Sequence, residues 1–369
     1  MDNLNILILG ILGDILGFKN GRIKENRFKI TKKKYGESYI SEGKNLAVTD
    51  FYSFFLDGGI NLNISNLKYS INTLLLMATM KGIINNKTNI IKGCSNEYCR
   101  IYKKIGEKNL KNKYFINNEY LNSLEKLCNN ESIHYNQIYD DSMVIPRILP
   151  ICLLFWNKEH RKKLIVEIIN NISLTHKNIT TYLSAITLGL FISFKKYNIN
   201  IDIWGEKLIE YLLSNEFDST IKELKLYSTE FVLNKEDYIT TWNEYLNSGL
   251  YKNRLDLIYK TTALVSYKRA NTLFLHFNDV ITSQEFVYGL KSDQAIIIAY
   301  DSLLLCDGSW EKMVIFGLLG ITDNSVLGML SGILFGLVYN SNNSINKEQY
   351  RNEPWVKKVI SLGKELDFN

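Results

Sequence analysis

A short polar cluster near the end of the chain contains residue types that can cap a helix or bind a ligand. Thr322, Asp323, Asn324 and Ser325 lie between two apolar segments. Side chains of these types can accept hydrogen bonds from the free N–H groups of a first helical turn. At this helix start Asp323 and its neighbours could also point into a binding site, because a helix N-terminus favours anions and ligands of complementary shape. The cluster alone supports both interpretations.

The apolar segment after this cluster carries Gly328, Gly332 and Gly336 at four-residue intervals. On a helix, this spacing places the three residues on one face. Because glycine has no Cβ, that face allows the backbone of a second helix to approach closely. We therefore predict a buried helix whose glycine face serves helix packing.

The chain of 369 residues is 46% hydrophobic and 22% charged, which is typical of a globular protein. It contains only three prolines, and so few helix breakers favour many helices. Its main apolar segments have lengths suited to buried helices, and they are Leu4–Phe18, Leu74–Ile84, Val144–Trp156, Leu164–Ile172, Leu183–Phe194, Ala295–Leu305 and Met313–Tyr339. We expect one large all-α domain covering residues 1–369. The polar cluster inside the last segment argues against a membrane span, because polar groups inside a bilayer are costly.

The formal net charge of +6 is small for this length, and most basic residues are dispersed. Two basic runs, 29–34 and 161–163, lack the density and interleaved aromatic residues of a nucleic-acid site, so we expect no nucleic-acid partner. Five cysteines at irregular spacing indicate a reducing, cytoplasmic compartment. The four histidines show no ligand spacing, which argues against zinc.

Six segments resemble motifs of the ADP-ribosylglycohydrolase family in their order and spacing. They are Gly10–Gly21, Tyr69–Thr79, Met143–Phe155, Leu174–Ala185, Ala295–Trp310 and Asp323–Tyr339. The Asn20-Gly21 ending of the first motif is similar to the ADP-ribosylarginine hydrolase branch. The resemblance extends from Leu7 to about Leu362. It implies an all-α orthogonal helix bundle of the ADP-ribosylglycohydrolase type, independently of the helix prediction above.

The resemblance implies that active relatives hold two Mg²⁺ ions between an Asp-Asp-Thr turn and an Asp-x-Asp helix start. There the ions bind the ribose hydroxyls and the water that attacks the anomeric carbon. Mg²⁺ needs near-octahedral oxygen ligands, and paired carboxylates balance the charge of two such ions. The corresponding metal positions here are degenerate, and they are Ile71, Asn72, Thr73, Asp323 and Ser325.

Two further positions of the family pattern also differ. The acidic position after the first helix falls at Lys24, with Glu25 as its neighbour, and a threonine position of the last motif is Leu327. Losing even an outer-shell partner typically lowers metal affinity or activity about 10–100-fold, and losing inner-shell anions should lower it more. We therefore predict that the dinuclear site is absent and that no cofactor is bound.

The resemblance also implies a set of substrate-binding residues, which are Ser142, Met143, His176, Gly289 and Lys291. Lys291 could supply positive charge to a diphosphate, whereas the Asp140-Asp141 pair would repel one. The glycines that line the pocket in active relatives are replaced at 141–143, and a Gly-His-Asp stretch is replaced by 292–294. His176 is more typical of a satisfied structural histidine than of a catalytic one.

Three functions stay open at this point. The first is an ADP-ribosylarginine hydrolase-like pseudoenzyme that binds ADP-ribose, an ADP-ribosylated protein or an unidentified protein partner. The second is an active or residual hydrolase that uses Mg²⁺ to cleave the N-glycosidic bond between ADP-ribose and arginine, with Asp323 or Glu25 as the general base. The third is a structural protein in which Ile71 and Leu327 fill the cleft.

Overall fold

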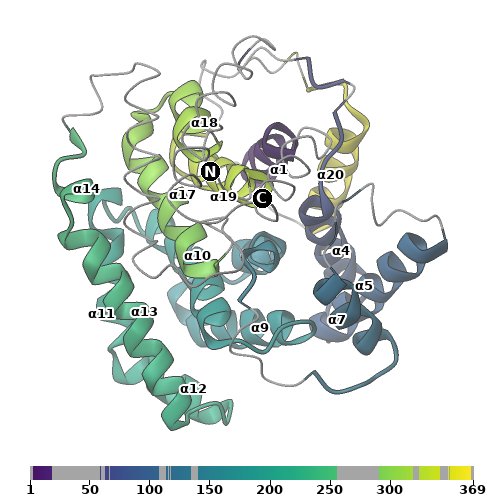
Figure 1. The fold of residues 1–369 in the computed structure, drawn as a ribbon. Helices are drawn as coiled ribbons and strands as arrows, with labels where there is room; N and C mark the ends of the chain where they lie inside the picture. The colour runs from purple at the N-terminus through teal and green to yellow at the C-terminus, as the bar shows by residue number, and fades with distance from the viewer. Residues whose placement is uncertain are drawn as a thin grey trace, which may run out of the picture.

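Two glycine-bearing apolar helices from opposite ends of the chain pack directly against each other. The computed structural model describes residues 3–18, 59, 63–65, 67–107, 114, 116, 118–133, 140–255, 291–318, 324–340, 348 and 350–366. Within them, α1 (Asn3–Phe18) lies along α19 (Asn324–Tyr339), and nearly every residue of both helices is buried. Figure 1 shows the pair in the interior, with the other helices arranged around it.

The glycines of these two helices face each other with no room for a side chain. A Cβ atom at Gly13 would lie 1.9 Å from the carbonyl oxygen of Gly328, and one at Gly332 would lie 2.2 Å from that of Leu9. A Cβ at Gly17 would lie 1.9 Å from the carbonyl oxygen of Asn324. The prediction that the C-terminal glycine face serves helix packing is confirmed.

Every regular element of the described residues is helical, which confirms the all-α prediction. The remaining α-helices are α4 (Ile71–Asn85), α5 (Ile90–Glu107), α7 (Asn118–Cys128), α8 (Leu149–Leu154), α9 (Arg161–Ser173), α10 (Ile179–Lys196), α11 (Trp204–Leu212), α12 (Asn215–Glu223), α13 (Thr229–Asn247), α14 (Gly249–Lys252), α17 (Ser292–Cys306), α18 (Trp310–Leu318) and α20 (Pro354–Glu365). The short 3₁₀ turns are η3 (Ser142–Val144), η4 (Pro146–Ile148), η5 (Lys158–His160) and η6 (Ile201–Ile203).

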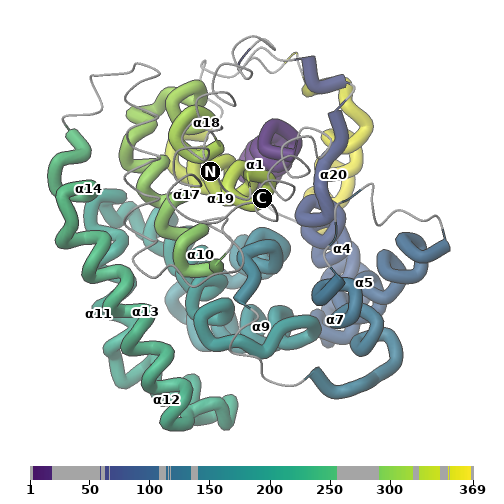
Figure 2. The backbone as a smooth tube through the Cα atoms, in the orientation of Figure 1, coloured from purple at the N-terminus to yellow at the C-terminus, as the bar shows by residue number. Residues whose placement is uncertain are grey.

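The helices around the central pair form two sides. On one side, α17 and α18 pack on α19, and α10 packs on α17; on the other, α20 contacts both α1 and α4, and α4 packs on α5. The tube view shows this arrangement, with α5 and α7 on the flank of α4, α9 at the bottom of the view, and α11 to α14 along the opposite edge (Figure 2). The first and last described helices therefore hold the same part of the core.

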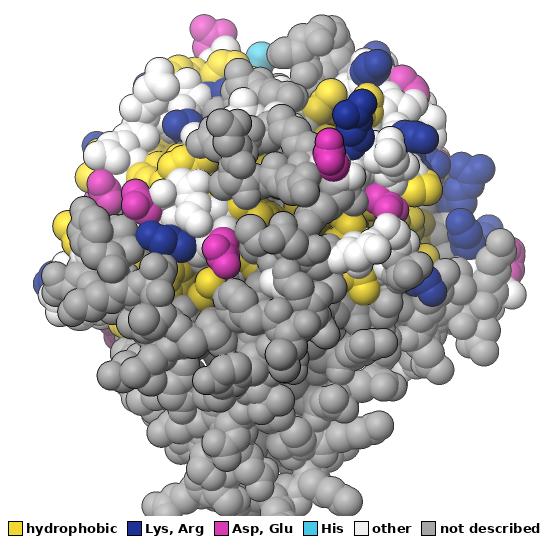
Figure 3. Space-filling view, turned by 90° about the horizontal axis from the view of Figure 1, so that it is seen from above, with side chains coloured by type: hydrophobic (Ala, Val, Ile, Leu, Met, Phe, Trp, Pro, Cys, Tyr) yellow, Lys and Arg dark blue, Asp and Glu magenta, His cyan; other side chains and the backbone are white. Residues whose placement is uncertain are grey.

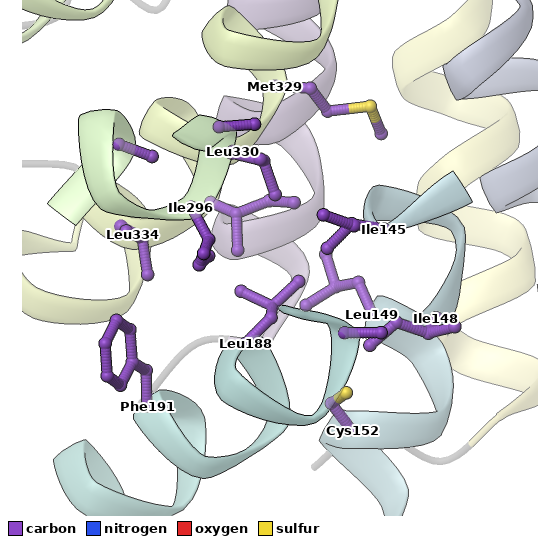
Figure 4. Close-up of a cluster of buried hydrophobic side chains, with 14 of the residues drawn as sticks. Ile145, Ile148, Leu149, Cys152, Leu188, Phe191, Ile296, Met329, Leu330 and Leu334 are labelled. Atoms are coloured by element: carbon purple, nitrogen blue, oxygen red, sulfur yellow. The ribbon is translucent and has the colours of Figure 1, made fainter. Parts of the chain in front are cut away.

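The apolar core is continuous from the central pair to α10 and to the segment around α8 (Figure 4). Its close-up shows buried side chains that come from four parts of the chain, and those labelled are Ile145, Ile148, Leu149, Cys152, Leu188, Phe191, Ile296, Met329, Leu330 and Leu334. Burial of one such aliphatic or aromatic side chain contributes about 1.5–3 kcal/mol. This core positions the starts of α4, α17 and α19, where the candidate site residues lie.

The edge formed by α11 to α14 is attached to the core by aromatic rings. The ring centroid of Phe191 on α10 lies 5.2 Å from those of Trp204 and Tyr300, and 5.9 Å from that of Trp242. Such tilted and edge-on pairs stabilise beyond their buried area. The cluster thereby joins α11 and α13 to α10 and α17.

The described part of the surface carries mixed charge. Seen from above, Lys and Arg side chains are interspersed with Asp and Glu side chains among the residues drawn in colour (Figure 3). No helix in the described ranges has both the length and the apolar character needed to cross a bilayer.

The close approach of α1 and α19 makes a stability prediction. We expect Gly13→Ala to lower the free energy of unfolding by about 1–3 kcal/mol or more, because the new Cβ would force the backbones of α1 and α19 apart. Urea unfolding followed by circular dichroism measures the change.

The matched control is Gly106→Ala, because Gly106 is exposed near the end of α5 and a Cβ there would meet no atom within 4 Å. Alanine at that position should raise stability by up to about 1 kcal/mol. Equal unfolding curves for the two variants would contradict the close contact between α1 and α19.

Candidate functional site

The N-terminus of α4 is held by an aspartate from α1. Asp14 is completely buried, and its carboxylate accepts hydrogen bonds from Ser70 N at 2.9 Å, Ser70 Oγ at 2.5 Å and Thr73 Oγ1 at 2.6 Å. Ser70 in turn is the N-cap residue of α4 and accepts from Asn72 N at 3.1 Å. A buried carboxylate beside a helix N-terminus is stabilised by such donors and by the helix dipole. Asp14 therefore serves as a capping and packing residue at the start of α4.

The structure brings together two candidate metal positions that are 253 residues apart in the sequence. Asn72 is completely buried in the first turn of α4, and its Nδ2 donates to Ser325 Oγ at 3.3 Å. Its Oδ1 is buried and has no hydrogen-bond donor. Ser325 lies in the first turn of α19. Asp323, the acidic position of this motif, lies outside the described residues, as do Lys24 and Glu25.

The side chains at this junction do not provide suitable ligand atoms for a pair of magnesium ions. Ile71 and Leu327, at two positions of the family pattern, are both 1% exposed and belong to the apolar core. The other described positions offer one carboxamide oxygen and two hydroxyls, and the hydroxyl of Thr73 is engaged with Asp14. Mg²⁺ sites need several oxygen ligands with negative charge. In the described ranges, no group of three or more His, Cys, Asp or Glu side chains could hold a metal ion.

A second aspartate holds the N-terminus of α17. Asp140 Oδ1 accepts from Ser292 N at 3.2 Å, from the Ser292 hydroxyl at short range, and from Thr181 Oγ1 at 3.0 Å. Burial, together with the nearby charge of Asp293, raises the pKa of Asp140 to about 6. Burial also raises the pKa of Asp293, against the opposing effects of the Gln294 N–H and the Lys291 charge. Two carboxylates therefore share this helix start.

The predicted substrate-binding residues of this region are placed differently from one another. Asp141 caps η3 by accepting from Met143 N at 2.8 Å, and Ser142 and Met143 are buried, at 0% and 3% exposure. Lys291 is exposed at the start of α17. Gly289 lies outside the described residues. The structure thus groups Ser142, Met143 and Lys291 around the Asp140 cap.

A buried arginine network was missed by the sequence analysis. Arg147 is completely buried, and its five N–H donors all have neutral acceptors at Tyr120 Oη, Thr175 Oγ1, Asn171 Oδ1 and the carbonyl oxygens of residues 171 and 172, at 2.7–3.4 Å. Its guanidinium also lies over the ring of Tyr98, 4.8 Å from the centroid. The sequence placed Arg147 and Thr175 in two motifs, but motif order does not reveal that they meet.

His176 belongs to the same network. It is 1% exposed, its Nδ1 lies 2.8 Å from Thr175 Oγ1, and its ring lies 5.5 Å from that of Tyr120. Burial, and secondly the Arg147 charge, hold the pKa of His176 well below its usual range. The imidazole is therefore neutral at physiological pH, which favours the structural interpretation of this predicted site residue.

Comparison with known proteins finds relatives whose names match the family that the motifs resemble. No family model matches the chain. It is similar to a protein of Acanthamoeba polyphaga mimivirus named as an ADP-ribosyl glycohydrolase, with 26% identity over 353 residues that make up 92% of this chain and 64% of that protein. It is also similar to ADP-ribosylhydrolase ARH1 of Dictyostelium discoideum, with 25% identity over 235 residues, 60% of this chain and 58% of that protein. The aligned regions span less than two thirds of either relative.

The buried arginine makes a second stability prediction. Arg147→Lys keeps the charge but provides only three donors for acceptors that now receive five, so we expect a loss of about 3–5 kcal/mol in the free energy of unfolding. Arg100→Lys is the control, because the Arg100 side chain is 74% exposed and its loss should cost about 0.5 kcal/mol or less. Similar chemical unfolding midpoints for the two variants would rule out a structural role for the network.

His176 predicts a pH dependence of stability. Below its ordinary pKa of 6.5 the unfolded chain binds a proton that the folded chain excludes, so stability should fall as pH falls, by up to about 1.4 kcal/mol per pH unit. Asp140 acts in the opposite sense between about pH 4 and 6, because its raised pKa lets the folded chain hold the extra proton.

The difference between wild type and His176→Gln isolates the histidine contribution, since Asp140 is common to both. Unfolding free energies measured between pH 5 and 7 should slope less steeply in the variant. The exposed His160→Gln is the control and should keep the wild-type slope. Parallel curves for wild type and His176→Gln would show that the ring is not excluded from protonation.

Proposed function

Because this chain belongs to the ADP-ribosylglycohydrolase family, we propose that it is a hydrolase-like member without the dinuclear magnesium site and without turnover. In this proposal it acts as a binding or scaffold protein. Its ligand class is ADP-ribose or an ADP-ribosylated protein, and the ADP-ribosylarginine hydrolase resemblance of its first motif points to modified arginine. A further protein partner would be recognised through the surface of the fold.

The observation that carries the proposal is the Asn72–Ser325 hydrogen bond between the starts of α4 and α19. At this junction the resemblance implies carboxylates that grip two cations. Two neutral side chains that bond directly to each other supply neither the charge nor the ligand number for this role. Ile71, packed in the core beside them, has no oxygen in its side chain.

In this proposal the two aspartates limit where the diphosphate of an ADP-ribose ligand could lie. A helix N-terminus binds an anion through its free N–H groups and its dipole. At α4 the carboxylate of Asp14 already accepts from Ser70, and at α17 the carboxylate of Asp140 already accepts from Ser292. A diphosphate approaching either helix start would meet a resident negative charge.

One observation favours the alternative, a residual hydrolase. The buried Oδ1 of Asn72 accepts no hydrogen bond from the described residues, so it is available to a further donor. In this alternative Asp323 acts as the general base toward water at the start of α19. The reaction would be hydrolysis of the N-glycosidic bond between ADP-ribose and arginine.

Calorimetric titration with ADP-ribose, with and without Mg²⁺, distinguishes these functions when it is combined with an assay for ADP-ribose release from modified arginine. We expect no turnover and no effect of Mg²⁺. Release that requires Mg²⁺ and is lost in Asp323→Ala would overturn the proposal in favour of the hydrolase. Binding without turnover identifies ADP-ribose as the ligand of the scaffold.

Restoring the carboxylates tests the metal argument directly. We expect Ile71→Asp/Asn72→Asp/Ser325→Asp to unfold at a lower temperature than wild type and to gain a Mg²⁺-dependent rise in that temperature, because a cation relieves the repulsion between buried acids. Asn243→Asp is the control, since Asn243 is exposed on α13 and the same change there should create no response. A Mg²⁺ response already present in the wild type would contradict the proposed loss of the site.

A further inference from the structure

A groove lies on the edge of the molecule that α11, α13 and α14 form (Figure 1). Its volume is about 400 Å³, which is within the range of small-ligand sites. The apolar part of its lining consists of Ile209 on α11, Leu246 on α13 and Tyr251 on α14. None of the lining residues belongs to α4, α17 or α19, so the groove is separate from the candidate site described above.

The aromatic wall of the groove is fixed in place. Tyr251 is 8% exposed, and its hydroxyl donates to the carbonyl oxygen of Asp202 and lies 3.4 Å from Glu206 Oε1. The guanidinium of Arg254 lies over the tyrosine ring, 4.1 Å from its centroid, and donates to Tyr251 O and Asp202 Oδ1, each at 2.8 Å. The ring cannot turn without breaking these contacts, so this wall is preorganised for a ligand.

Four polar side chains line the rest of the groove, and they are Glu206 on α11, Asn243 and Asn247 on α13, and Lys252 on α14. Other charged side chains of this edge are paired, as Lys207 is with Glu210. Within the described part of the chain, the ammonium group of Lys252 and the two carboxamides make no hydrogen bond or ion pair, and the carboxylate of Glu206 has only its long contact with Tyr251. These four groups are therefore available to a ligand.

The helices α11 and α13 run antiparallel where they form the groove. Asp202, just before α11, meets Tyr251, which follows α13. Three residues further on, a Cβ atom at Gly205 would lie 2.8 Å from Leu246 Cδ2. Residue numbers therefore rise along α11 as they fall along α13.

This direction orders the lining groups along the groove. The end next to α14 holds Glu206, Asn247 and Lys252, which supply a carboxylate, a carboxamide and an ammonium group. One helical turn away, the other end holds Ile209 and the carboxamide of Asn243. Opposite charges thus lie together at one end, and an apolar stretch separates them from a second polar group.

We propose that this groove binds a free basic α-amino acid such as arginine. The ammonium and carboxylate of the ligand pair with Glu206 and Lys252, and charge-assisted hydrogen bonds of this kind are the stronger ones. The aliphatic part of its side chain covers the apolar stretch. The cation at the end of that side chain donates to Asn243 Oδ1, because a carboxamide oxygen accepts hydrogen bonds.

The charge of this edge favours a basic ligand over an acidic one. Residues 204–252 include nine acidic and five basic side chains, although the whole chain carries a net charge of +6. A local excess of one sign attracts ligands of the other sign. The inference does not depend on the proposed function, because the groove shares no residue with the starts of α4, α17 and α19.

Equilibrium dialysis of the full chain against radiolabelled L-arginine tests the site. We expect one saturable site per chain with a dissociation constant of roughly 0.1–1 mM, since a few charged contacts hold a small ligand in an open groove. Agmatine lacks the carboxylate and L-norvaline lacks the guanidinium, so each should compete about tenfold more weakly than arginine, or worse.

Variants at the charged end locate the site. Glu206→Gln and Lys252→Met should each weaken arginine binding about tenfold or more. Glu210→Gln and Lys225→Met are the matched controls, because both residues are exposed on the same edge, neither lines the groove, and each substitution changes the charge equally. The controls should keep the wild-type affinity within about twofold, since exposed charges outside a contact contribute little.

Each outcome decides the proposal. Saturable binding that weakens in both groove variants and persists in both controls supports it. No saturable binding up to about 10 mM arginine, equal weakening in groove and control variants, or full binding in the groove variants would overturn it. Competition by agmatine or norvaline as strong as that by arginine would also overturn it. None of these results changes the outcome of the ADP-ribose titration, so the two proposals fail separately.

Discussion

The contact between the glycine faces of α1 and α19 is the constraint on which the other arrangements depend. It allows two backbones to approach so closely that a Cβ at Gly13 would overlap the carbonyl group of Gly328. Asp14 follows Gly13 on α1, and Ser325 precedes Gly328 by one turn on α19. The same contact therefore places the Asp14 carboxylate at the start of α4 and brings Ser325 to Asn72. A side chain in this contact would move both polar groups at once.

Aspartate carboxylates occupy the starts of α4 and α17. Asp14 accepts three hydrogen bonds beside α4, and Asp140 accepts three beside α17. Hydrogen bonds and the helix dipole stabilise these two charges, so the folded protein gains order where an anion could otherwise bind. The burial that raises the pKa of Asp140 shows that the charge is still costly there. Stability and ligand binding compete for the same N–H groups.

Arg147, in contrast, is a buried cation. Its hydrogen-bond acceptors are all neutral. Every N–H donor has an acceptor, and Tyr98 supplies the face of an aromatic ring. Such a group fixes the relative positions of η4, α5, α7 and α9, because any displacement leaves donors unpaired in a medium of low polarity. Burial, and secondly the charge of this cation, oppose protonation of His176 and keep its imidazole neutral. The network thus joins residues of two sequence motifs by direct hydrogen bonds.

The sequence by itself determined the helical class and the family motifs, because apolar segments, scarce prolines and glycine spacing are local properties that need no knowledge of contacts. It also led to the prediction that carboxylates are missing at Ile71, Asn72 and Ser325, since a residue type is visible without coordinates. Only the tertiary structure decided which residues meet. It joined Asn72 to Ser325, placed Asp140 at the start of α17 and surrounded Arg147 with acceptors. These contacts join residues far apart in the sequence and arise from helix packing. They therefore cannot be derived from motif order and residue spacing.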